Sequence, residues 1–172
     1  MDHHYQIYYE NVYLRPLEEA DIENLRIWRN DPRNSAFLSK QPYITPQMQR
    51  EWFNKYRIDD DEICFAIVET CELNRTVGSL CLYDFSEDSC FFGKILVGDE
   101  DAHGRKVGLN ATLAATKIAF EQLKTREVKL CVYAENIGAF KVYKQAGFRI
   151  INEHYSLSGM KEYTMIRKLE DK

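Results

Sequence analysis

Asn136 and Tyr143 are the residues whose types and spacing bear most directly on chemistry. Apolar residues recur every three to four positions between them, so both are expected on one short helix. A phenol with a pKa of about 10 can protonate a departing thiolate, whose conjugate acid has a pKa near 8.5. The alternative is purely structural, with Tyr143 half-buried in the core and Asn136 serving as a helix cap.

A strand is expected before this helix and a glycine after it. Val128, Leu130 and Val132 alternate with other residues over positions 128–133, which is the two-residue period of a strand with one apolar face. Gly147 suits the left-handed conformation that ends many helices, and an alternating pattern resumes directly behind it. The predicted unit is strand, capped helix, glycine stop and strand.

This order resembles the acyl-CoA end of the GNAT N-acetyltransferase family. In that family the strand and the helix splay apart, and the pantetheine arm and the acetyl thioester lie in the gap. The resemblance implies that acetyl-CoA is the cosubstrate. It also implies that Tyr143 is the general acid for the CoA thiolate and that Asn136 is a polar contact beside the cofactor.

The loop before the longest predicted helix is a candidate phosphate site. Backbone N–H groups at a helix start suit an anion, and the helix dipole adds positive potential. The GNAT loop reads Arg or Gln, two variable residues, Gly, one variable residue, then Gly or Ala. Lys106 here replaces the usual Gly, which implies a slightly different loop. The expected pyrophosphate contacts are His103, Gly104, Arg105, Lys106, Val107, Gly108 and Leu109.

The strand that leads into this loop is expected to present its backbone to the cofactor. Backbone groups of Ile95, Leu96 and Val97 would pair with the amide-rich pantetheine as an added strand would. The side chains of the same residues fit equally well as ordinary core residues.

The sequence defines the general base less well than it defines the cofactor contacts. An amine must lose a proton before it attacks a thioester, and its pKa is about 10. Some ribosomal-protein acetyltransferases of this superfamily use a strand Glu where this chain has Cys131. Asp84, at the end of a strand that should border the cleft, is the preferred candidate, with a plain turn acid as the alternative. Lys94 also remains, whereas Glu69 and Glu135 are expected to be solvated.

The amino-terminal third resembles the GNAT branch of ribosomal-protein alanine acetyltransferases and amino sugar nucleotide acetyltransferases. Arg29, with Arg33 nearby, could pair with a diphosphate, and aromatic side chains could stack on a sugar or a base. The alternative is a helix end with a core tryptophan and solvated arginines. The candidate substrate residues are Trp28, Arg29, Asn30 and Tyr43, with Phe37 as a further flat face.

The resemblance implies transfer of an acetyl group from acetyl-CoA to a primary amine by direct attack on the thioester. The preferred acceptor is a small molecule such as a nucleotide-linked amino sugar. A protein N-terminus and a non-catalytic acyl-CoA-binding sensor domain are the alternatives.

The order of elements predicts an α/β (α+β) chain with the GNAT acyl-CoA N-acyltransferase fold. The expected sheet is mixed, mostly antiparallel and seven-stranded, flanked by about four helices in one domain over residues 1–172. The second helix should start behind Thr45 and Pro46 and bury Met48, Trp52, Phe53 and Tyr56. Strands are expected near 12–16, 63–69, 76–83, 91–97, 128–133, 148–157 and 161–169, with the longest helix at 107–123.

Composition narrows the class of protein. With 172 residues, 45% of them hydrophobic, the chain is long enough for one domain. A formal charge of -4 argues against nucleic acid or membrane partners, and the lack of a signal-like or spanning segment predicts a cytoplasmic protein. The five cysteines are expected to be reduced and structural. No metal is expected, since no C-x-x-C or H-x-x-x-H spacing occurs. A homodimer is compatible with the sequence.

Overall fold

The computed structural model describes residues 2–34, 42–59 and 61–170. Over these residues the strands form an eight-stranded sheet in the order β1-β2-β3-β4-β5-β6-β8-β7. The strands are β1 (Ile7–Tyr9), β2 (Val12–Pro16), β3 (Glu62–Glu69), β4 (Arg75–Tyr83), β5 (Ser89–Val97), β6 (Glu127–Tyr133), β7 (Arg149–Tyr155) and β8 (Lys161–Lys168). The helices are α1 (Ile22–Asn30), α2 (Pro46–Ile58), α3 (Val107–Glu121) and α4 (Ile137–Gln145), with short 3-10 turns η1 (Glu19–Asp21) and η2 (Glu100–Ala102).

The strand count is one higher than the sequence predicted. β1 pairs with β2 in a hairpin that places Tyr9 opposite Val12, so only Glu10 and Asn11 form the turn. Such two-residue turns need a positive φ, and Glu10 has a φ of 50°. Because Glu is not one of the residues that mark these turns, the sequence gives no hairpin signal there. The other predicted strands and helices are confirmed, and their ends differ by a few residues.

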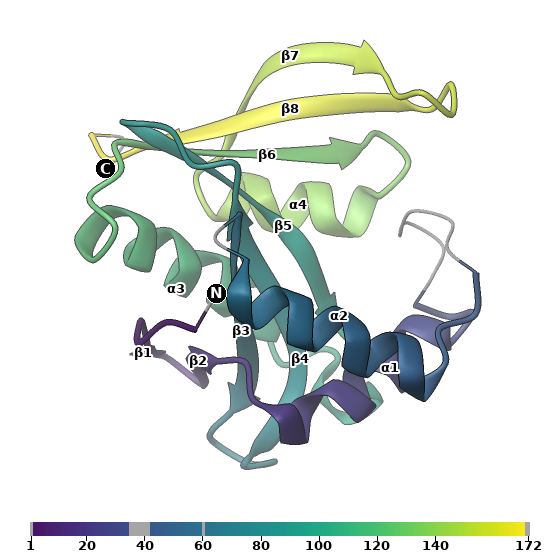
Figure 1. Ribbon diagram of the computed structural model, residues 1–172. Coiled ribbons are helices and arrows are strands. Elements are labelled where there is room, and N and C mark those ends of the chain that lie inside the picture. Colours follow the sequence, from purple (N-terminus) through teal and green to yellow (C-terminus); the bar gives the residue numbers. More distant parts are fainter. Residues whose placement is uncertain (1, 35–41, 60, 171–172) are drawn as a thin grey trace.

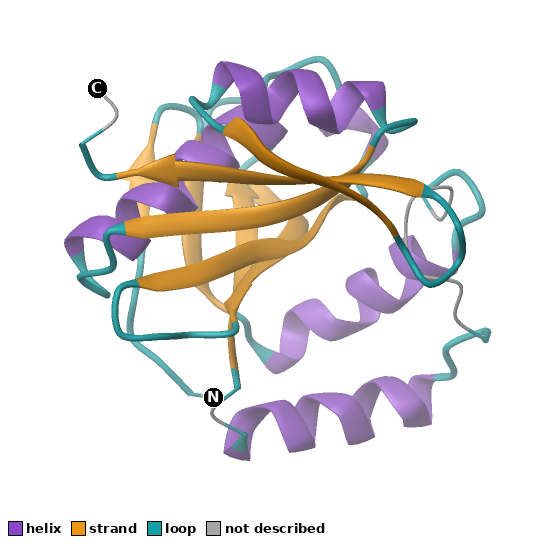
Figure 2. Ribbon diagram, turned by 90° about the horizontal axis from the view of Figure 1, so that it is seen from above, coloured by secondary structure: helices purple, strands orange, loops and turns teal. Residues whose placement is uncertain are grey.

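Helices cover both faces of the sheet (Figures 1 and 2). Helices α3 and α4 pack on the larger apolar core, which includes Phe65, Phe92 and Leu130. Helices α1 and α2 cover a smaller second core on the other face, around Leu25 and Phe53. None of the helices in the described ranges is long and apolar enough to cross a membrane.

Helix α2 starts as predicted but buries a different face. Thr45 caps it by accepting a hydrogen bond from the Met48 N–H over 3.2 Å. Its buried residues are Gln49, Phe53 and Tyr56. The prediction of a buried Met48 and Trp52 is wrong, because these side chains are 41% and 37% exposed. The buried residues recur at i, i+4 and i+7, a stripe that excludes both.

The cysteines are not all reduced thiols. Cys64 of β3 lies opposite Cys81 of β4, and the two form a disulfide. The expectation of five free thiols is therefore wrong for this pair, since strand register decides which cysteines meet and single-sequence patterns do not reveal register. Among the free cysteines, Cys90 is buried whereas Cys71 and Cys131 are exposed.

Candidate functional site

A wedge opens in the sheet between β5 and β6. These strands pair in parallel over three positions, from Ser89 opposite Glu127 to Phe91 opposite Lys129. Beyond this point β5 continues along β4, whereas β6 continues along β8 (Figure 1). Backbone groups on that edge of β5 therefore have no partner in β6. Such an edge suits an extended, amide-rich ligand.

A bulge lies in β5 beside this wedge. Ser79 faces Leu96 and Cys81 faces Gly93, so two residues of β5 share the space opposite one residue of β4. One of the two, Lys94, has a left-handed φ of 52°. A bulge of this kind takes a backbone unit out of the ladder and re-aims it.

The predicted contacts Ile95, Leu96 and Val97 lie on the diverging part of β5. The side chain of Leu96 is buried, and those of Ile95 and Val97 pack against the larger core. The His103 ring hydrogen-bonds the Val97 carbonyl through Nε2 over 3.0 Å. The side chains therefore belong to the core, and the backbone is the part of this segment that remains for a ligand.

Helix α4 places Tyr143 against the wedge. Asn136 caps the helix by accepting from the Ala139 N–H over 3.1 Å, and Gly147 ends it with a φ of 87°. The Tyr143 ring is buried, with its edge toward Phe92 of β5 at 6.0 Å between ring centroids. Burial raises the pKa of Tyr143, and the phenol of Tyr83 adds to this shift. The Tyr143 hydroxyl has no hydrogen-bond partner among the described residues.

The loop before α3 has the geometry of an anion site. The helical ladder begins where the Asn110 N–H donates to the Lys106 carbonyl over 2.9 Å, so the N–H groups of residues 107–109 lie outside it. No side chain of the described residues caps this helix start. A Cβ added to Gly104 or Gly108 would meet no atom within 4 Å, so the backbone is open on this side.

Lys106 itself takes the left-handed conformation that its usual Gly would favour, with a φ of 58° and a ψ of 15°. Arg105 lies nearby but is held by Glu72 at 2.5 Å and by the Asp101 carbonyl at 2.6 Å. Lys106 forms no ion pair with any described residue, so its positive charge, unlike that of Arg105, is not neutralised by a neighbouring carboxylate.

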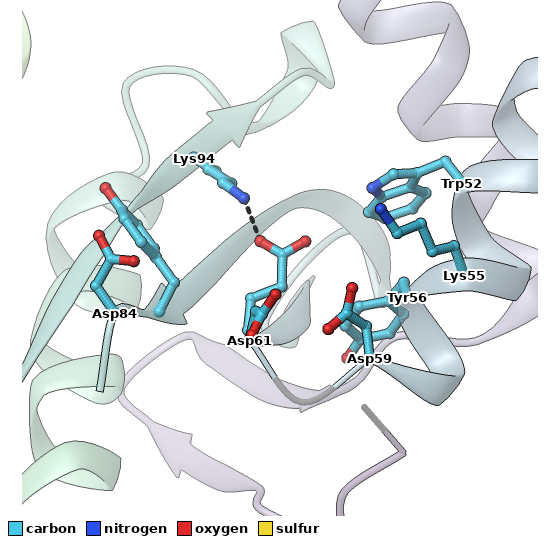
Figure 3. A pocket seen from close by; sticks show the side chains of 9 residues that line it. Trp52, Lys55, Tyr56, Asp59, Asp61, Asp84 and Lys94 are labelled. Carbon is cyan, nitrogen blue, oxygen red and sulfur yellow. Dashed lines mark hydrogen bonds and ion pairs between the residues drawn. The ribbon is translucent and has the colours of Figure 1, made fainter. Parts of the chain in front are cut away.

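A cavity of about 240 Å³ opens on the α1–α2 side of the sheet. Figure 3 shows Trp52 and Lys55 of α2 on one side of it and Asp84 on the other. Lys94 of β5 forms an ion pair with Glu62 of β3 inside it. The lining residues are Trp52, Lys55, Tyr56, Asp59, Asp61, Glu62, Tyr83, Asp84 and Lys94.

Tyr83 connects this cavity to the wedge. A Cβ on Gly93 would lie 2.9 Å from the Tyr83 hydroxyl, so the ring covers the β5 backbone only because residue 93 is Gly. Burial raises the pKa of Tyr83 to about 12, and Cys131 of β6 contributes to the shift. Tyr83 thus faces the gap from the cavity side, and it interacts electrostatically with Tyr143.

The residues predicted to bind the acceptor do not form one cluster. Trp28 packs on Gly98 at the end of β5, where an added Cβ would lie 2.2 Å from the indole. Asn30 uses its amide to hold the Ile44 backbone, at 2.8 and 2.9 Å. Tyr43 is 68% exposed and lies 3.3 Å from Arg26. Phe37 lies outside the described residues.

Among the residues predicted to bind the acceptor, Arg29 has a charged side chain that could still bind a ligand. Its side chain is partly buried, and burial lowers its pKa while Glu62 opposes the shift. It makes no hydrogen bond or ion pair with a described residue. Arg33, in contrast, is paired with Asp31 at 2.6 Å and with Glu100.

The acidic residues considered as the general base lie in different environments. Glu69 was expected to be solvated, but it is buried and accepts backbone N–H bonds from residues 71, 72 and 73, so that prediction is wrong. Glu135 is exposed, as predicted. Asp84 is exposed and lines the cavity. The sequence prediction missed Glu62, which follows an acidic run typical of a turn, and Tyr83.

Comparison with known proteins agrees with this geometry. The family model described as "Acetyltransferase (GNAT) domain" matches residues 11–149. The chain therefore belongs to the GNAT acetyltransferase family, and it is an acetyltransferase.

Relatives and solved structures cover most of the chain. Acetyltransferase PseH of Campylobacter jejuni (strain 81-176) is 28% identical over 137 residues, 80% of this chain and 82% of the relative. Spermidine N-acetyltransferase from Vibrio cholerae, solved with CoA and spermine, superposes with a TM-score of 0.82 at 20% identity, covering 94% of this chain and 97% of that one. Apo FdhC, a nucleotide-linked sugar GNAT, gives a TM-score of 0.80 at 19% identity, covering 96% and 90%.

Proposed function

We propose that this single-domain acetyltransferase moves the acetyl group of acetyl-CoA to the primary amine of a small molecule by direct attack on the thioester. The observation that carries the proposal is the wedge between β5 and β6, with the Tyr143 phenol beneath it. The open α3 start, with Lys106 beside it, fits the pyrophosphate of CoA. The structural similarity to a GNAT enzyme solved with CoA supports this choice of cosubstrate.

In the proposed reaction, the neutral amine nitrogen attacks the thioester carbonyl. The new C–N bond forms, the C–S bond breaks, and the CoA thiolate leaves. In this proposal a backbone N–H at the β5 bulge beside Lys94 stabilises the negative charge that develops on the carbonyl oxygen.

Tyr143 is proposed to act on the thiolate. Its pKa is raised by burial, so the phenol stays protonated at neutral pH. Even an ordinary phenol lies about 1.5 pKa units above a thiol, and each unit is worth about 1.4 kcal/mol. Full proton transfer is therefore uphill, and the main contribution of Tyr143 is a hydrogen bond that stabilises the departing sulfur.

The proton on the attacking amine needs an acceptor on the cavity side. Asp84 keeps this role in our proposal because it lines the cavity and is solvent-exposed, so it can pass the proton to water. Glu62 is less exposed and is paired with Lys94, which suits it to orient an ammonium group.

The preferred acceptor is a nucleotide-linked amino sugar. A cavity of about 240 Å³ lies below the size of typical sites for drug-sized ligands, so it would hold the amine-bearing sugar and leave the nucleotide outside. In this proposal Arg29, which is partly buried and has no described partner, binds a phosphate of that nucleotide outside the cavity. FdhC, a GNAT of nucleotide-linked sugars, shares the fold.

A second candidate is a polycationic amine. The cavity is lined by four carboxylates, Asp59, Asp61, Glu62 and Asp84, and by two lysines. An excess of negative charge favours an acceptor with several ammonium groups. The spermidine acetyltransferase from V. cholerae has the same fold.

A thiol-release screen separates these acceptors. Amino sugar nucleotides, polyamines and peptide amino termini are each offered with acetyl-CoA. If a sugar nucleotide is the acceptor, Arg29→Ala should raise its KM about 10- to 100-fold, the loss expected for one charged hydrogen bond. Arg50→Ala, on the exposed side of α2, is the matched control and should leave KM unchanged. Turnover of polyamines alone would favour the second candidate, and turnover of peptides alone would exclude both.

A further inference from the structure

Three side chains that ligate metals meet on one face of the β6–β8–β7 arm. Cys131 comes from β6, Glu162 from β8 and His154 from β7, and one ligand atom of each lies within 4.8 Å of the others. They lie far apart in the sequence, so no short motif marks them. The register brings them together: Glu162 lies directly opposite His154 on β7, and Cys131 lies opposite the nearby Thr164 of β8.

This face of the arm is not the core face. Val128, Leu130 and Val132 of β6 point into the larger core beneath α3 and α4. Cys131 alternates with them and therefore points to the opposite side of the sheet, where it is exposed. The cluster borders the wedge, because Cys131 lies on β6 just past Lys129, the last residue that pairs with β5.

The distances suit a tetrahedral cation. His154 Nε2 lies 3.2 Å from a Glu162 carboxylate oxygen. Two zinc ligands about 2.05 Å from the metal, at a tetrahedral angle, are about 3.3 Å apart. The nitrogen and oxygen are thus already at the separation that a shared zinc requires. The sulfur lies within 4.8 Å of both atoms, and rotation about χ1 of the exposed Cys131 side chain can bring it closer.

The three side chains have little else to bind. His154 Nδ1 is buried without a hydrogen-bond partner among the described residues, so a metal at Nε2 displaces only the contact with Glu162. The sulfur of Cys131 has only a long contact, 3.8 Å, with the Thr164 hydroxyl.

We propose that Cys131, His154 and Glu162 bind a divalent transition-metal ion of the zinc class, with the fourth coordination position open. One thiolate, one imidazole and one carboxylate form a donor set that zinc uses readily. The thiolate and the carboxylate neutralise the charge of the dication. The ion would link β6, β8 and β7 beside the wedge. This inference departs from the expectation of no metal and does not depend on the identity of the acceptor.

The test uses the full, untagged chain, purified anaerobically and kept free of added reductant so that the Cys64–Cys81 disulfide stays intact. Co²⁺ is titrated first, because a bound thiolate gives a sulfur-to-cobalt charge-transfer band, and Zn²⁺ is then added to displace it. The expected result is one Co²⁺ per chain, with the band lost on addition of Zn²⁺. Zn²⁺ should also raise the melting temperature.

Variants locate the ion. Cys131→Ser should abolish the charge-transfer band. Glu162→Gln should weaken Zn²⁺ binding by at least about 100-fold, because loss of an outer-shell partner alone can cost that much and Glu162 is proposed as a direct ligand. Cys71→Ser removes the other exposed free thiol and should bind like wild type. Binding by Cys131→Ser within threefold of wild type would overturn the proposal. So would a band that survives this substitution and disappears in Cys64→Ser, since Glu62, Cys64 and Cys81 are also close together.

Discussion

The two faces of the sheet are held by different kinds of interaction. On the face of α3 and α4, the core is large and apolar, and the candidate cofactor contacts are mainly backbone groups and one buried phenol. On the face of α1 and α2, the core is small. Polar links hold that layer in place, from Asp21 to the sheet and from Asn30 to Ile44. The candidate acceptor cavity on this side is lined by charged side chains.

This difference indicates how the proposed cofactor binding and the proposed acceptor binding can vary independently. Backbone geometry tolerates changes in side chains, so one cofactor site can persist while sequence diverges. A cavity built from charged side chains changes its specificity with each substitution. Five predictions test this contrast, ordered from the largest expected effect to the smallest.

Tyr143→Phe tests the cofactor face. Loss of the hydroxyl should lower kcat by about 10- to 10,000-fold, the range for a proton donor or hydrogen-bond donor to the transition state. The Kd for acetyl-CoA, measured by calorimetry, should stay within about twofold of wild type. Tyr155→Phe, at a tyrosine that is 72% exposed on β7, is the control. Equal turnover in the two variants would remove the proposed role of Tyr143.

Asp21→Asn tests the polar attachment of α1. Asp21 is buried and accepts hydrogen bonds from Arg15 at 2.7 and 2.8 Å, from Thr76 at 2.9 Å and from the Glu18 N–H at 2.9 Å. Removing one partner of a buried ion pair typically lowers the free energy of unfolding by about 3–5 kcal/mol. Urea unfolding should show this loss. Glu23→Gln, an exposed acid on the same helix, should change it by less than about 1 kcal/mol.

The same carboxylate predicts a pH dependence. Burial acts to raise the pKa of Asp21, but the hydrogen bonds from Arg15, Glu18 and Thr76 outweigh it and hold the pKa below the usual value. The stabilisation is therefore complete above about pH 5 and declines as the pH falls below about 4. Asp21→Asn should flatten this part of the stability profile. An unchanged acid limb would show that other carboxylates determine it.

Gly98→Ala tests the contact between the two layers at the end of β5. The added Cβ would lie 2.2 to 2.5 Å from Trp28, so the indole and α1 would have to move. Overpacking of this kind costs about 1–3 kcal/mol. Thermal unfolding should detect it. Gly138→Ala, where the nearest atom is 3.9 Å away, should be neutral or slightly stabilising.

Lys106→Gly tests whether the cofactor loop depends on backbone shape more than on side-chain identity. A non-Gly residue in the left-handed conformation costs about 1–2 kcal/mol, and Gly adds back about 0.5–1 kcal/mol of unfolded-state entropy. The variant should therefore be slightly more stable, by about 0.5–1 kcal/mol. Lys106→Val should be less stable than wild type, because a β-branched residue fits this conformation poorly. The reverse order would contradict the assignment of strain to this position.

The sequence predicted the strand, cap and glycine stop around α4 well, for a physical reason. The period-two pattern of β6, the Asn136 cap and the Gly147 stop are local signals, and each is present in the structure. Lys106 shows the limit of such patterns. It is a non-Gly residue in the left-handed conformation, with a φ of 58°, and its residue type alone does not indicate this.

The acceptor face could not be predicted in the same way. Its cavity combines residues of α2, β3, β4 and β5, and only tertiary packing brings them together. Trp52 was assigned to the buried stripe of α2, but that stripe is Gln49, Phe53 and Tyr56, and Trp52 lines the cavity. The Cys64–Cys81 disulfide and the Cys131 cluster both depend on strand register, which a single sequence does not determine.

The most direct test of the account is a crystal structure of the protein with acetyl-CoA. The account predicts that the pantetheine pairs with the free edge of β5 between β5 and β6. It also predicts that the thioester sulfur lies within about 3.5 Å of the Tyr143 hydroxyl, which is hydrogen-bond distance for a sulfur acceptor. A cofactor bound elsewhere, or a Tyr143 hydroxyl directed into the core and away from the sulfur, would contradict it.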